Sequence, residues 1–349
     1  MNKKYDFGIV IGRFQPFHLA HQKLIEHSLS LAEKVIVILG SARSAPDVKN
    51  PFTPRMREEI IRACFPNEEN RLIFRAVRDY PYNDHVWTAE IQNIVGEITE
   101  EFATEQAKTA FFGFFKDKSS YYLNLFPQWN FEEFYTSDKK LLSITATKVR
   151  ESFFTEDNIW CKLVPKTVET YLNVFKTTEF FPHLQSEFAY LQKYKEDTKF
   201  VGVPFAPIFV TTDAVVVQSG HVLVIRRGFQ PGKGLLALPG GFLAPDATLE
   251  DSAIRELKEE TQIKVPAQVL RGSIKNSHAF DYPERSQRGR TITFAYYIEL
   301  APDLKDGLPR VKGGDDAAKA FWLPLSALGE KEDEFFEDHL SIIRFFLGL

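Results

Sequence analysis

The chain has 349 residues, of which 44% are hydrophobic, and a formal net charge of −4 at pH 7. Its length suits two domains that each bury a core of their own. So small a net charge argues against a protein that coats nucleic acid, but it leaves room for small anionic ligands, which need positive charge only locally. Two cysteines are too few for a disulfide framework and favour the reducing cytoplasm. We expect neither a signal peptide nor a membrane-spanning segment.

The first part of the chain, residues 1–185, alternates short β-rich runs with amphipathic helical patterns. Strands are predicted at residues 6–12, 35–41, 72–77, 109–114 and 131–135, and helices at residues 19–33, 54–65 and 84–102. This alternation predicts an α/β domain with a doubly wound, Rossmann-like parallel sheet, whose ligands lie at the carboxyl ends of the strands.

The second part has a different pattern. We expect a charged helical linker at residues 186–204, without any motif, and a new domain at residues 205–349. That domain opens with a strand at 206–210, followed by a strand pair at 214–218 and 221–227 that turns at Ser219 and Gly220. A mixture of strands and a later helix predicts an α+β fold.

Two histidines follow the end of the first strand, in the stretch G-R-F-Q-P-F-H-L-A-H at residues 12–21. His18 and His21 are three residues apart, so at a helix start they share one face and lie beside unpaired backbone N–H groups, where phosphate binds well. Two imidazoles there can donate hydrogen bonds to a phosphate chain. Solvated surface histidines and a zinc pair are the alternatives, although no further His or Cys cluster lies nearby to complete a zinc site.

A second stretch, S-I-T-A-T-K-V-R at residues 143–150, has the composition of a helix start that can hold phosphates. Thr145 and Thr147 offer hydroxyls, and Arg150 can neutralise phosphate charge. Taken alone, the stretch also fits an ordinary helix cap. Arg55 and Arg57 could add phosphate contacts, and a solvated helix face is the alternative for both.

In the second domain, L-P-G-G-F at residues 238–242 precedes R-E-L-K-E-E at residues 255–260. On a helix, Glu256, Glu259 and Glu260 reach one side, where three carboxylates repel one another unless hard cations such as Mg²⁺ bind between them and a diphosphate. Arg255 can orient a glutamate by bidentate pairing. A solvated charged helix surface is the alternative.

These motifs carry a family resemblance. The histidine stretch matches the signature of the nucleotidyltransferase superfamily with a His-x-x-His motif, and residues 143–150 resemble its second signature. Residues 49–52, 77–87 and 121–129 are more specifically similar to archaeal-type nicotinamide mononucleotide (NMN) adenylyltransferases. A sister adenylyl- or cytidylyltransferase with another phosphate acceptor is the alternative, and the segment 77–87 argues against it.

The resemblance implies roles for residues of the first domain. It implies catalytic roles for His18, His21 and Arg150, contacts of Asn83 and Trp87 with the nicotinamide of NMN, and Mg²⁺ bridging the phosphates of ATP. An indole can stack on the cationic pyridinium ring; packing in the core is the alternative for Trp87. The residues that the resemblance assigns to ATP are Gly12, Arg13, Phe14, Gly113, Asp117, Thr145 and Thr147.

The glutamate-rich helix resembles the Nudix box, and residues 280–293 resemble a stretch of ADP-ribose-hydrolysing Nudix enzymes, including those fused to NMN adenylyltransferases. This implies a metal site for Mg²⁺ or Mn²⁺ at Gly241 and the three glutamates, with Arg255 as a catalytic partner. Ala247 and Gln262 stand where the pattern has glutamate and glycine, and Glu250 is a candidate substitute for the missing carboxylate.

The resemblance further implies ADP-ribose contacts by arginines of the stretch 280–293, namely Arg285, Arg288 and Arg290. The whole chain therefore resembles a bifunctional NMN adenylyltransferase/Nudix hydrolase with small nucleotides as its partners, and the sequence leaves open whether it forms a homo-oligomer. A Nudix domain kept as a ligand sensor or structural module is the alternative, supported by Ala247. A DNA-binding Nudix-related repressor is disfavoured, because no winged-helix segment follows the box.

Overall fold

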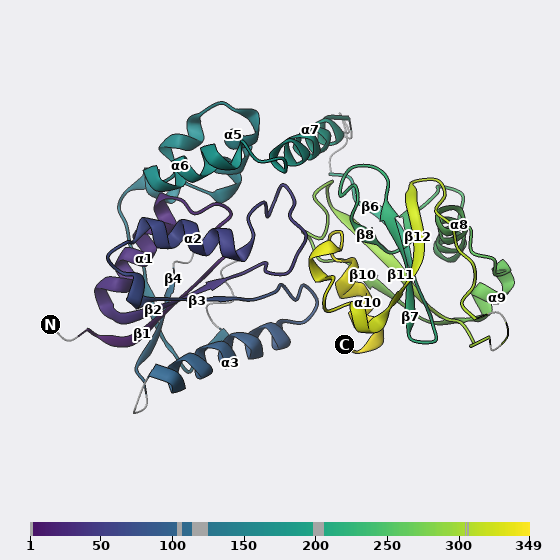
Figure 1. Cartoon of the computed structure of the whole chain (residues 1–349), viewed down its shortest axis with the longest axis horizontal. Coiled ribbons are helices and arrows are strands. Elements are labelled where there is room, and N and C mark those ends of the chain that lie inside the picture. Colours follow the sequence, from purple (N-terminus) through teal and green to yellow (C-terminus); the bar gives the residue numbers. More distant parts are fainter. Residues whose placement is uncertain (1–2, 103–106, 114–124, 198–205, 304, 306) are drawn as a thin grey trace. The chain divides into compact units, whose positions relative to one another are not determined.

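The structure is a computed structural model of the whole chain, and it describes residues 3–102, 107–113, 125–197, 206–303, 305 and 307–349. The chain divides into two compact units, Met1–Gln185 and Ser186–Leu349 (Figure 1). The elements of the first unit are β1 (Tyr5–Gly12), α1 (Leu19–Leu31), β2 (Ala32–Leu39), α2 (Pro54–Cys64), β3 (Leu72–Ala76), α3 (Asp84–Phe102), β4 (Thr109–Gly113), β5 (Asn130–Glu133), α4 (Lys139–Leu142), α5 (Ala146–Thr155), α6 (Lys166–Phe175) and the start of α7 (Phe181–Asp197).

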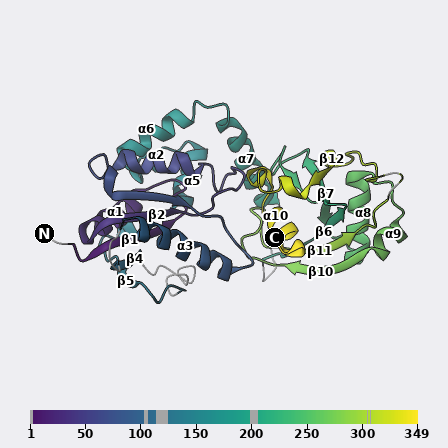
Figure 2. The ribbon, with the colours of Figure 1, turned by 60° about the horizontal axis from the view of Figure 1, so that its bottom comes forward.

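The first unit is built on a five-stranded sheet of order β3-β2-β1-β4-β5, in which every neighbouring pair is parallel. The strand order reverses between β1 and β4, which makes this point the place where doubly wound sheets bind ligands. Helix α3 lies on one face of the sheet and α2 on the other (Figures 1 and 2). The doubly wound parallel sheet predicted from the alternation of strands and helices is confirmed.

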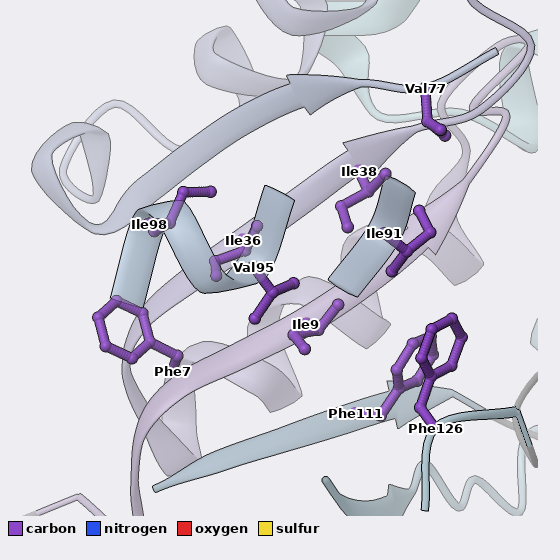
Figure 3. Close-up of a cluster of buried hydrophobic side chains, with 10 residues drawn as sticks. All are labelled: Phe7, Ile9, Ile36, Ile38, Val77, Ile91, Val95, Ile98, Phe111 and Phe126. Carbon is purple, nitrogen blue, oxygen red and sulfur yellow. The ribbon is translucent and has the colours of Figure 1, made fainter. Parts of the chain in front are cut away.

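The core of this unit lies between the sheet and α3 (Figure 3). Ile91, Val95 and Ile98 repeat at helical spacing and point from α3 towards Ile9 and Ile36 of the two central strands. All five side chains are at most 2% exposed. Packing of this kind makes the strands rigid, so the loops at their carboxyl ends start from fixed positions.

The second unit holds a seven-stranded mixed sheet. Its main path is β10-β11-β6-β7-β12; β6 and β11 are parallel, while β7 is antiparallel to both β6 and β12. Helix α8 packs on this sheet through Ile254 and Leu257. The elements of the second unit are β6 (Phe209–Gln218), β7 (His221–Arg227), β8 (Leu236–Ala237), β9 (Gly240–Phe242), α8 (Leu249–Thr261), α9 (Ala267–Gly272), β10 (Ile274–Phe280), β11 (Thr291–Glu299), β12 (Ala317–Pro324) and α10 (His339–Leu347).

One strand differs from the sequence-based expectation. Residues 206–210 and 214–218 were expected as separate strands, whereas β6 is continuous from Phe209 to Gln218. The polar residues Thr212 and Asp213 made the sequence look interrupted, yet both are buried, at 0% and 5% exposed. A parallel neighbour on one side and β9 on the other satisfy the backbone, so the strand runs through. In the described part of the chain, no helix has the length and apolar character needed to cross a membrane.

Candidate functional sites

The loop after β1 packs closely against the ring of Phe14, one of its own residues. A side chain at Gly12 would lie 2.9 Å from the ring of Phe14, so only glycine fits there. Phe14 itself has a φ of 51°, in the left-handed region that few L-residues adopt. Its ring is buried and meets the His21 ring edge-on, with centroids 4.8 Å apart. The strand end thus fixes a tight turn that leads directly to the two histidines.

The two histidines stand together at the start of α1. His18 is the N-cap, and its Nδ1 accepts a hydrogen bond from the backbone N–H of His21 at 3.4 Å. The two rings are stacked, with centroids 3.5 Å apart and planes 16° from parallel. Because Nδ1 of His18 is an acceptor here, Nε2 is the ring nitrogen that can donate to a ligand. The structure therefore brings His18 and His21 together at a helix N-terminus, as predicted.

Arg57 holds the neighbouring loops in place rather than facing solvent. Its side chain donates to the carbonyls of Arg13 at 2.7 Å and Gly40 at 2.6 Å, which follow β1 and β2, and its residue is 1% exposed. Burial lowers its pKa to about 10, with Asp79 acting in the opposite direction. Neither expectation for Arg57, a phosphate contact or a solvated face, describes it. Arg55, by contrast, is exposed and pairs with Glu59 at 2.9 Å.

Helix α5 brings Arg150 to the same loop. Its Nη1 donates to the carbonyl of Gln15 at 2.6 Å, and Nη2 lies 3.4 Å from Oγ1 of Thr147. Burial and the nearby Arg13 guanidinium lower the pKa of Arg150 to about 10. Thr145 is the N-cap of α5 and accepts from the N–H of Lys148 at 3.2 Å. The histidine stretch and the stretch 143–150, about 130 residues apart in sequence, thus meet at one place.

The residues expected to face nicotinamide lie at the start of α3. Asn83 is exposed and its Oδ1 accepts from the N–H of Val86 at 3.2 Å. Trp87 is half-buried and packs against the core cluster, with its ring centroid 5.9 Å from that of Phe126. One part of the indole thus belongs to the core and the rest reaches the surface. Gly113 is the last residue of β4, whereas Asp117 lies outside the described residues.

In the second unit, Arg255 pairs with two glutamates of its own helix. Its Nη2 lies 2.6 Å from Oε1 of Glu256, and its Nη1 lies 2.6 Å from Oε2 of Glu259. The Glu256 side chain is 13% exposed, whereas that of Glu259 is 45% exposed. Burial raises the pKa of Glu256, and Glu259 raises it further against the opposing effect of Arg255.

The Pro-Gly-Gly turn lies directly against these carboxylates. A side chain at Gly241 would come within 2.6 Å of the Glu256 carboxylate, and the N–H of Gly240 donates to Oε2 of Glu260 at 2.8 Å. Burial raises the pKa of Glu260 to about 8, and Glu256 adds to this although the Gly240 N–H opposes it. Glycine is thus required for a close approach of backbone and carboxylate.

The donor set fits a hard divalent cation. Carboxylates and a backbone carbonyl are the ligands that Mg²⁺ and Mn²⁺ prefer. Burial is the main cause of the raised pKa values of Glu256 and Glu260 and neighbouring carboxylates add to it, so a cation would offset the cost of ionising them. In the described residues, however, no three His, Cys, Asp or Glu side chains are gathered into a ready metal cage. Arg255 binds one oxygen of Glu256 and one of Glu259, and the second oxygen of each carboxylate can serve a cation.

The three arginines of the stretch 280–293 have different surroundings. Arg285 is buried and forms a bidentate pair with Asp338, at 2.9 and 2.8 Å. Arg288 lies over the Phe242 ring at 5.3 Å, and Arg290 donates to the carbonyl of Asp281 at 2.6 Å. Arg288 and Arg290 are half-buried, so they reach a surface that Arg285 does not.

Sequence reasoning missed the segment around the start of α10, which supports the Pro-Gly-Gly turn. Nδ1 of His339 accepts from the N–H of Leu238 at 2.9 Å, and the N–H of Phe336 donates to the carbonyl of Leu236 at 2.8 Å. Burial and nearby arginines, Arg285 first, lower the pKa of His339 well below its usual range, so the ring stays neutral. No local motif marks these contacts, which span about a hundred residues.

The departures from the Nudix pattern have clear structural counterparts. Gln262 is the C-cap of α8 with a φ of 46°, which explains why the pattern has glycine there. Glu250 pairs with Arg271 at 3.3 Å, so its carboxylate already has a partner outside the glutamate cluster. Ala247 lies in the turn that precedes α8. The expectation that Glu250 replaces the missing glutamate gains no support from this pairing.

Comparison with known proteins agrees with the geometry. Residues 9–152 match the cytidylyltransferase-like family, and residues 207–346 match the NUDIX domain family. A nicotinamide/nicotinic acid mononucleotide adenylyltransferase of Acinetobacter baylyi is 36% identical over 53% of this chain and 94% of its own length. An ADP-ribose pyrophosphatase of Methanocaldococcus jannaschii is 30% identical over 39% of this chain and 70% of its own length.

A solved structure resembles the whole chain. It is a bifunctional NMN adenylyltransferase/ADP ribose pyrophosphatase from Francisella tularensis, complexed with AMP and a manganese ion; it is 32% identical, with a TM-score of 0.88 and coverage of 99% of both chains. The fold and the two sites define a nucleotidyltransferase joined to a Nudix domain. The chain belongs to the family of bifunctional NMN adenylyltransferase/ADP-ribose pyrophosphatases.

Proposed function

We propose that the chain is a bifunctional enzyme of NAD metabolism with one active site in each unit. The first unit transfers AMP from ATP to NMN, giving NAD and pyrophosphate; the second hydrolyses ADP-ribose to AMP and ribose 5-phosphate. The observation that carries this proposal is the likeness to the Francisella protein over 99% of both chains, together with the presence of both motif sets. We place it in the cytoplasm and assign it small nucleotides, not nucleic acid, as substrates.

In the first unit, the phosphate of NMN attacks the α-phosphorus of ATP directly, and no protein nucleophile is needed. His18 and His21 bind the α- and β-phosphates through ring N–H groups at the helix N-terminus, while Arg13 and Arg150 offset the charge that develops. The fixed loop aligns both reactants, which contributes by orientation. The buried surroundings that lower the pKa of Arg150 favour this role, because an anionic phosphate relieves the crowding of cations.

Binding of the two nucleotides involves further residues. Gly12, Phe14 and Gly113 shape the strand ends against ATP, and Thr145 and Thr147 offer hydroxyls at the start of α5. Bound Mg²⁺ would bridge phosphate oxygens and neutralise part of their charge. We assign the nicotinamide of NMN to the exposed amide of Asn83 and the accessible part of Trp87; Asp117 is assigned to ATP by resemblance alone.

In the second unit, Glu256, Glu259, Glu260 and the carbonyl of Gly241 would hold Mg²⁺, with Mn²⁺ as a substitute. A divalent cation bound there would supply Lewis acidity towards water and positive charge towards the diphosphate. Arg255 orients Glu256 and Glu259 through one carboxylate oxygen of each. The protein's own contribution is the close backbone approach at Gly240 and Gly241.

The three arginines of the stretch 280–293 have different roles in binding ADP-ribose. Arg288 and Arg290 contact the substrate, since both are only half-buried, and the Arg288 guanidinium lies over the ring of Phe242, next to the Gly-Gly turn. For Arg285 we propose a supporting role in place of the direct contact expected from the sequence, because its side chain is buried and Asp338 occupies the Nε/Nη2 edge of its guanidinium.

One preparation tests the proposal. Incubation with NMN and ATP should give NAD and pyrophosphate, and incubation with ADP-ribose and Mg²⁺ or Mn²⁺ should give AMP and ribose 5-phosphate. A Glu260→Ala variant, which should lose only the second reaction, is the control for a contaminating hydrolase. NAD formation without any AMP from ADP-ribose would contradict the second activity and favour a ligand-sensing role for residues 205–349.

A further inference from the structure

The residues at the start of α10 contact two separate parts of the second site. We call residues 336–339, with the sequence F-E-D-H, the anchor segment. Its end residues, Phe336 and His339, form hydrogen bonds with the stretch that leads into the Pro-Gly-Gly turn. Its two middle residues pair with arginines of the stretch 280–293 instead. One short segment therefore connects the turn with the arginines of the second site.

Glu337 is the residue of the anchor segment whose carboxylate is least satisfied. Its side chain is only 6% exposed. Oε1 accepts from the N–H of Gln287 at 3.3 Å, whereas Oε2 has no hydrogen-bond partner among the described residues and lies 4.0 Å from Nη2 of Arg288. A buried carboxylate is costly unless a cation faces it. The Arg288 guanidinium is thus the cation that this oxygen is placed to meet.

The backbone at Glu337 has an unusual conformation. Its φ is 45°, in the left-handed region that residues other than glycine rarely adopt. Such a conformation persists where neighbouring contacts determine it, and here Phe336 is bound on one side while Asp338 pairs with Arg285 at 2.8 Å on the other. The fold therefore maintains a strained residue at the point where the anchor segment reaches Arg288.

Three neighbours define the place of the Arg288 guanidinium. Its Nε donates to Oγ of Ser286 at 3.3 Å, its Nη2 faces Glu337, and its central carbon lies 5.3 Å from the centre of the Phe242 ring. Burial raises the pKa of Glu337, and Arg288 is the strongest influence in the opposite direction. Ser286 belongs to the same stretch as Arg288, so Glu337 supplies the charged contact that comes from elsewhere in the sequence.

We propose that Glu337 is a positioning residue for the second reaction, and that it acts by holding the Arg288 guanidinium in place for the substrate. The inference rests on the proposed ADP-ribose hydrolysis and on the substrate contact assigned to Arg288. An arginine side chain has many rotamers, and fixing one of them beforehand reduces the entropy lost on binding. Since Glu337 acts through Arg288 and not on the reacting atoms, its effect should appear in substrate binding rather than in the chemical step.

A substitution that removes the charge and keeps the shape isolates this effect. Glu337→Gln retains an oxygen that can accept from the Gln287 N–H, so the anchor segment should keep its place. We expect the KM for ADP-ribose to rise about 3- to 30-fold, within the range for coupled residues of one charge network, while kcat stays within about twofold. NAD synthesis by the same sample should be unchanged.

A double-mutant cycle shows whether Glu337 acts through Arg288. In an Arg288→Ala background, Glu337→Gln should change the KM by less than about twofold, because the group that it positions is gone. In an Arg290→Ala background it should keep its full effect, since Arg290 donates to the carbonyl of Asp281 and, in the described part of the chain, forms no ion pair with Glu337. Equal effects in the two backgrounds would show general damage and would overturn the proposal.

Glu334→Gln is the matched control for the loss of a carboxylate. Glu334 lies three residues before Glu337 and pairs with Lys331 at 2.6 Å and Arg226 at 3.3 Å, outside the stretch 280–293. This variant should leave the KM for ADP-ribose unchanged. A rise in the KM as large as that of Glu337→Gln would overturn the proposal as well.

Hydrogen exchange of the metal-free protein tests the proposal without hydrolysis. ADP-ribose should protect peptides that contain residues 238–242, and Glu337→Gln should raise the concentration for half-maximal protection by the same factor as the KM. If this shift is seen but the wild type releases no AMP from ADP-ribose, hydrolysis is contradicted and the positioning role stands. An unchanged concentration in the variant would overturn the positioning role alone, and a wild type with neither protection nor AMP release would overturn both.

Discussion

The proposed phosphate sites of the two units differ in the charge of their buried side chains. In the first unit, burial lowers the pKa of both Arg57 and Arg150 to about 10, and the Arg13 guanidinium acts in the same direction on Arg150. In the second, buried carboxylates crowd together, and burial raises the pKa of Glu256 and brings that of Glu260 to about 8. A site with surplus positive charge binds an anion directly, whereas a site with surplus negative charge needs a cation between itself and the phosphate.

The units also resemble each other in one respect. In each unit the proposed ligand site includes a glycine-containing loop at a strand end, and a buried side chain distant in sequence holds that loop. Arg57 does this in the first unit by donating to carbonyls, and His339 in the second by accepting from the Leu238 N–H. Long-range contacts of the fold thus hold the geometry of each loop, whereas the charged side chains beside the loop decide which chemistry it supports.

The largest expected effect comes from Arg150. Arg150→Ala should reduce kcat for NAD synthesis roughly 100- to 1,000-fold, the usual cost of losing one group that stabilises transition-state charge. Arg150→Lys should recover part of the loss, because a point charge remains without the fork of donors. Steady-state assays of NAD formation check this, and ADP-ribose hydrolysis by the same sample should be unchanged. Equal loss of both activities would show that the variant disturbs the whole chain.

Removing Arg57 should destabilise the first unit. Arg57→Ala leaves the buried carbonyls of Arg13 and Gly40 without this donor, and we expect a loss of about 3 kcal/mol in the free energy of unfolding. Urea unfolding followed by hydrogen exchange of peptides from β1 and β2 measures it. Arg55→Ala, on the exposed face of the same helix, is the matched control and should change stability by less than about 0.5 kcal/mol. Similar effects of both variants would contradict the account.

Stability of the metal-free second unit should fall as pH rises from about 4.5 to about 8. The folded state holds the proton of Glu260 up to a pKa of about 8, while the unfolded chain releases it near 4.5. Between these values the folded state binds more protons, so its stabilisation is complete below the lower pKa and is lost as pH approaches the upper one. Hydrogen exchange of α8 peptides in EDTA measures this. Glu260→Gln should flatten the dependence, and a slope that survives in this variant would place its origin elsewhere.

The smallest effect concerns the helix ends. Glu156 ends α5 with a φ of 60° and Gln262 ends α8 with a φ of 46°, so each unit has a non-glycine residue in the left-handed region. Glu156→Gly and Gln262→Gly should each stabilise their unit by about 1 kcal/mol. Urea unfolding of each variant measures this. Gln262→Ala, which keeps the strain, should give no such gain; a gain as large as that of glycine would refute the explanation.

The sequence predicted features that depend on neighbouring residues. The order of strands and helices followed from hydrophobic periodicity, and the pairing of His18 with His21 followed from helical spacing. Two kinds of feature could not be predicted from the sequence. Asp213 interrupted an apolar run and so hid the continuity of β6. The contacts of Arg57 and His339 join residues far apart in sequence, and only the folded chain shows which partners they meet.

We infer that the chain holds two independent active sites, one lined by buried arginines and the other by buried glutamates. Both activities should be measured in parallel on the wild type, His18→Ala, Glu256→Gln and the double variant. We predict that His18→Ala loses NAD synthesis and keeps ADP-ribose hydrolysis, that Glu256→Gln does the reverse, and that only the double variant loses both. Loss of both activities in either single variant, or hydrolysis that persists in Glu256→Gln, would contradict it.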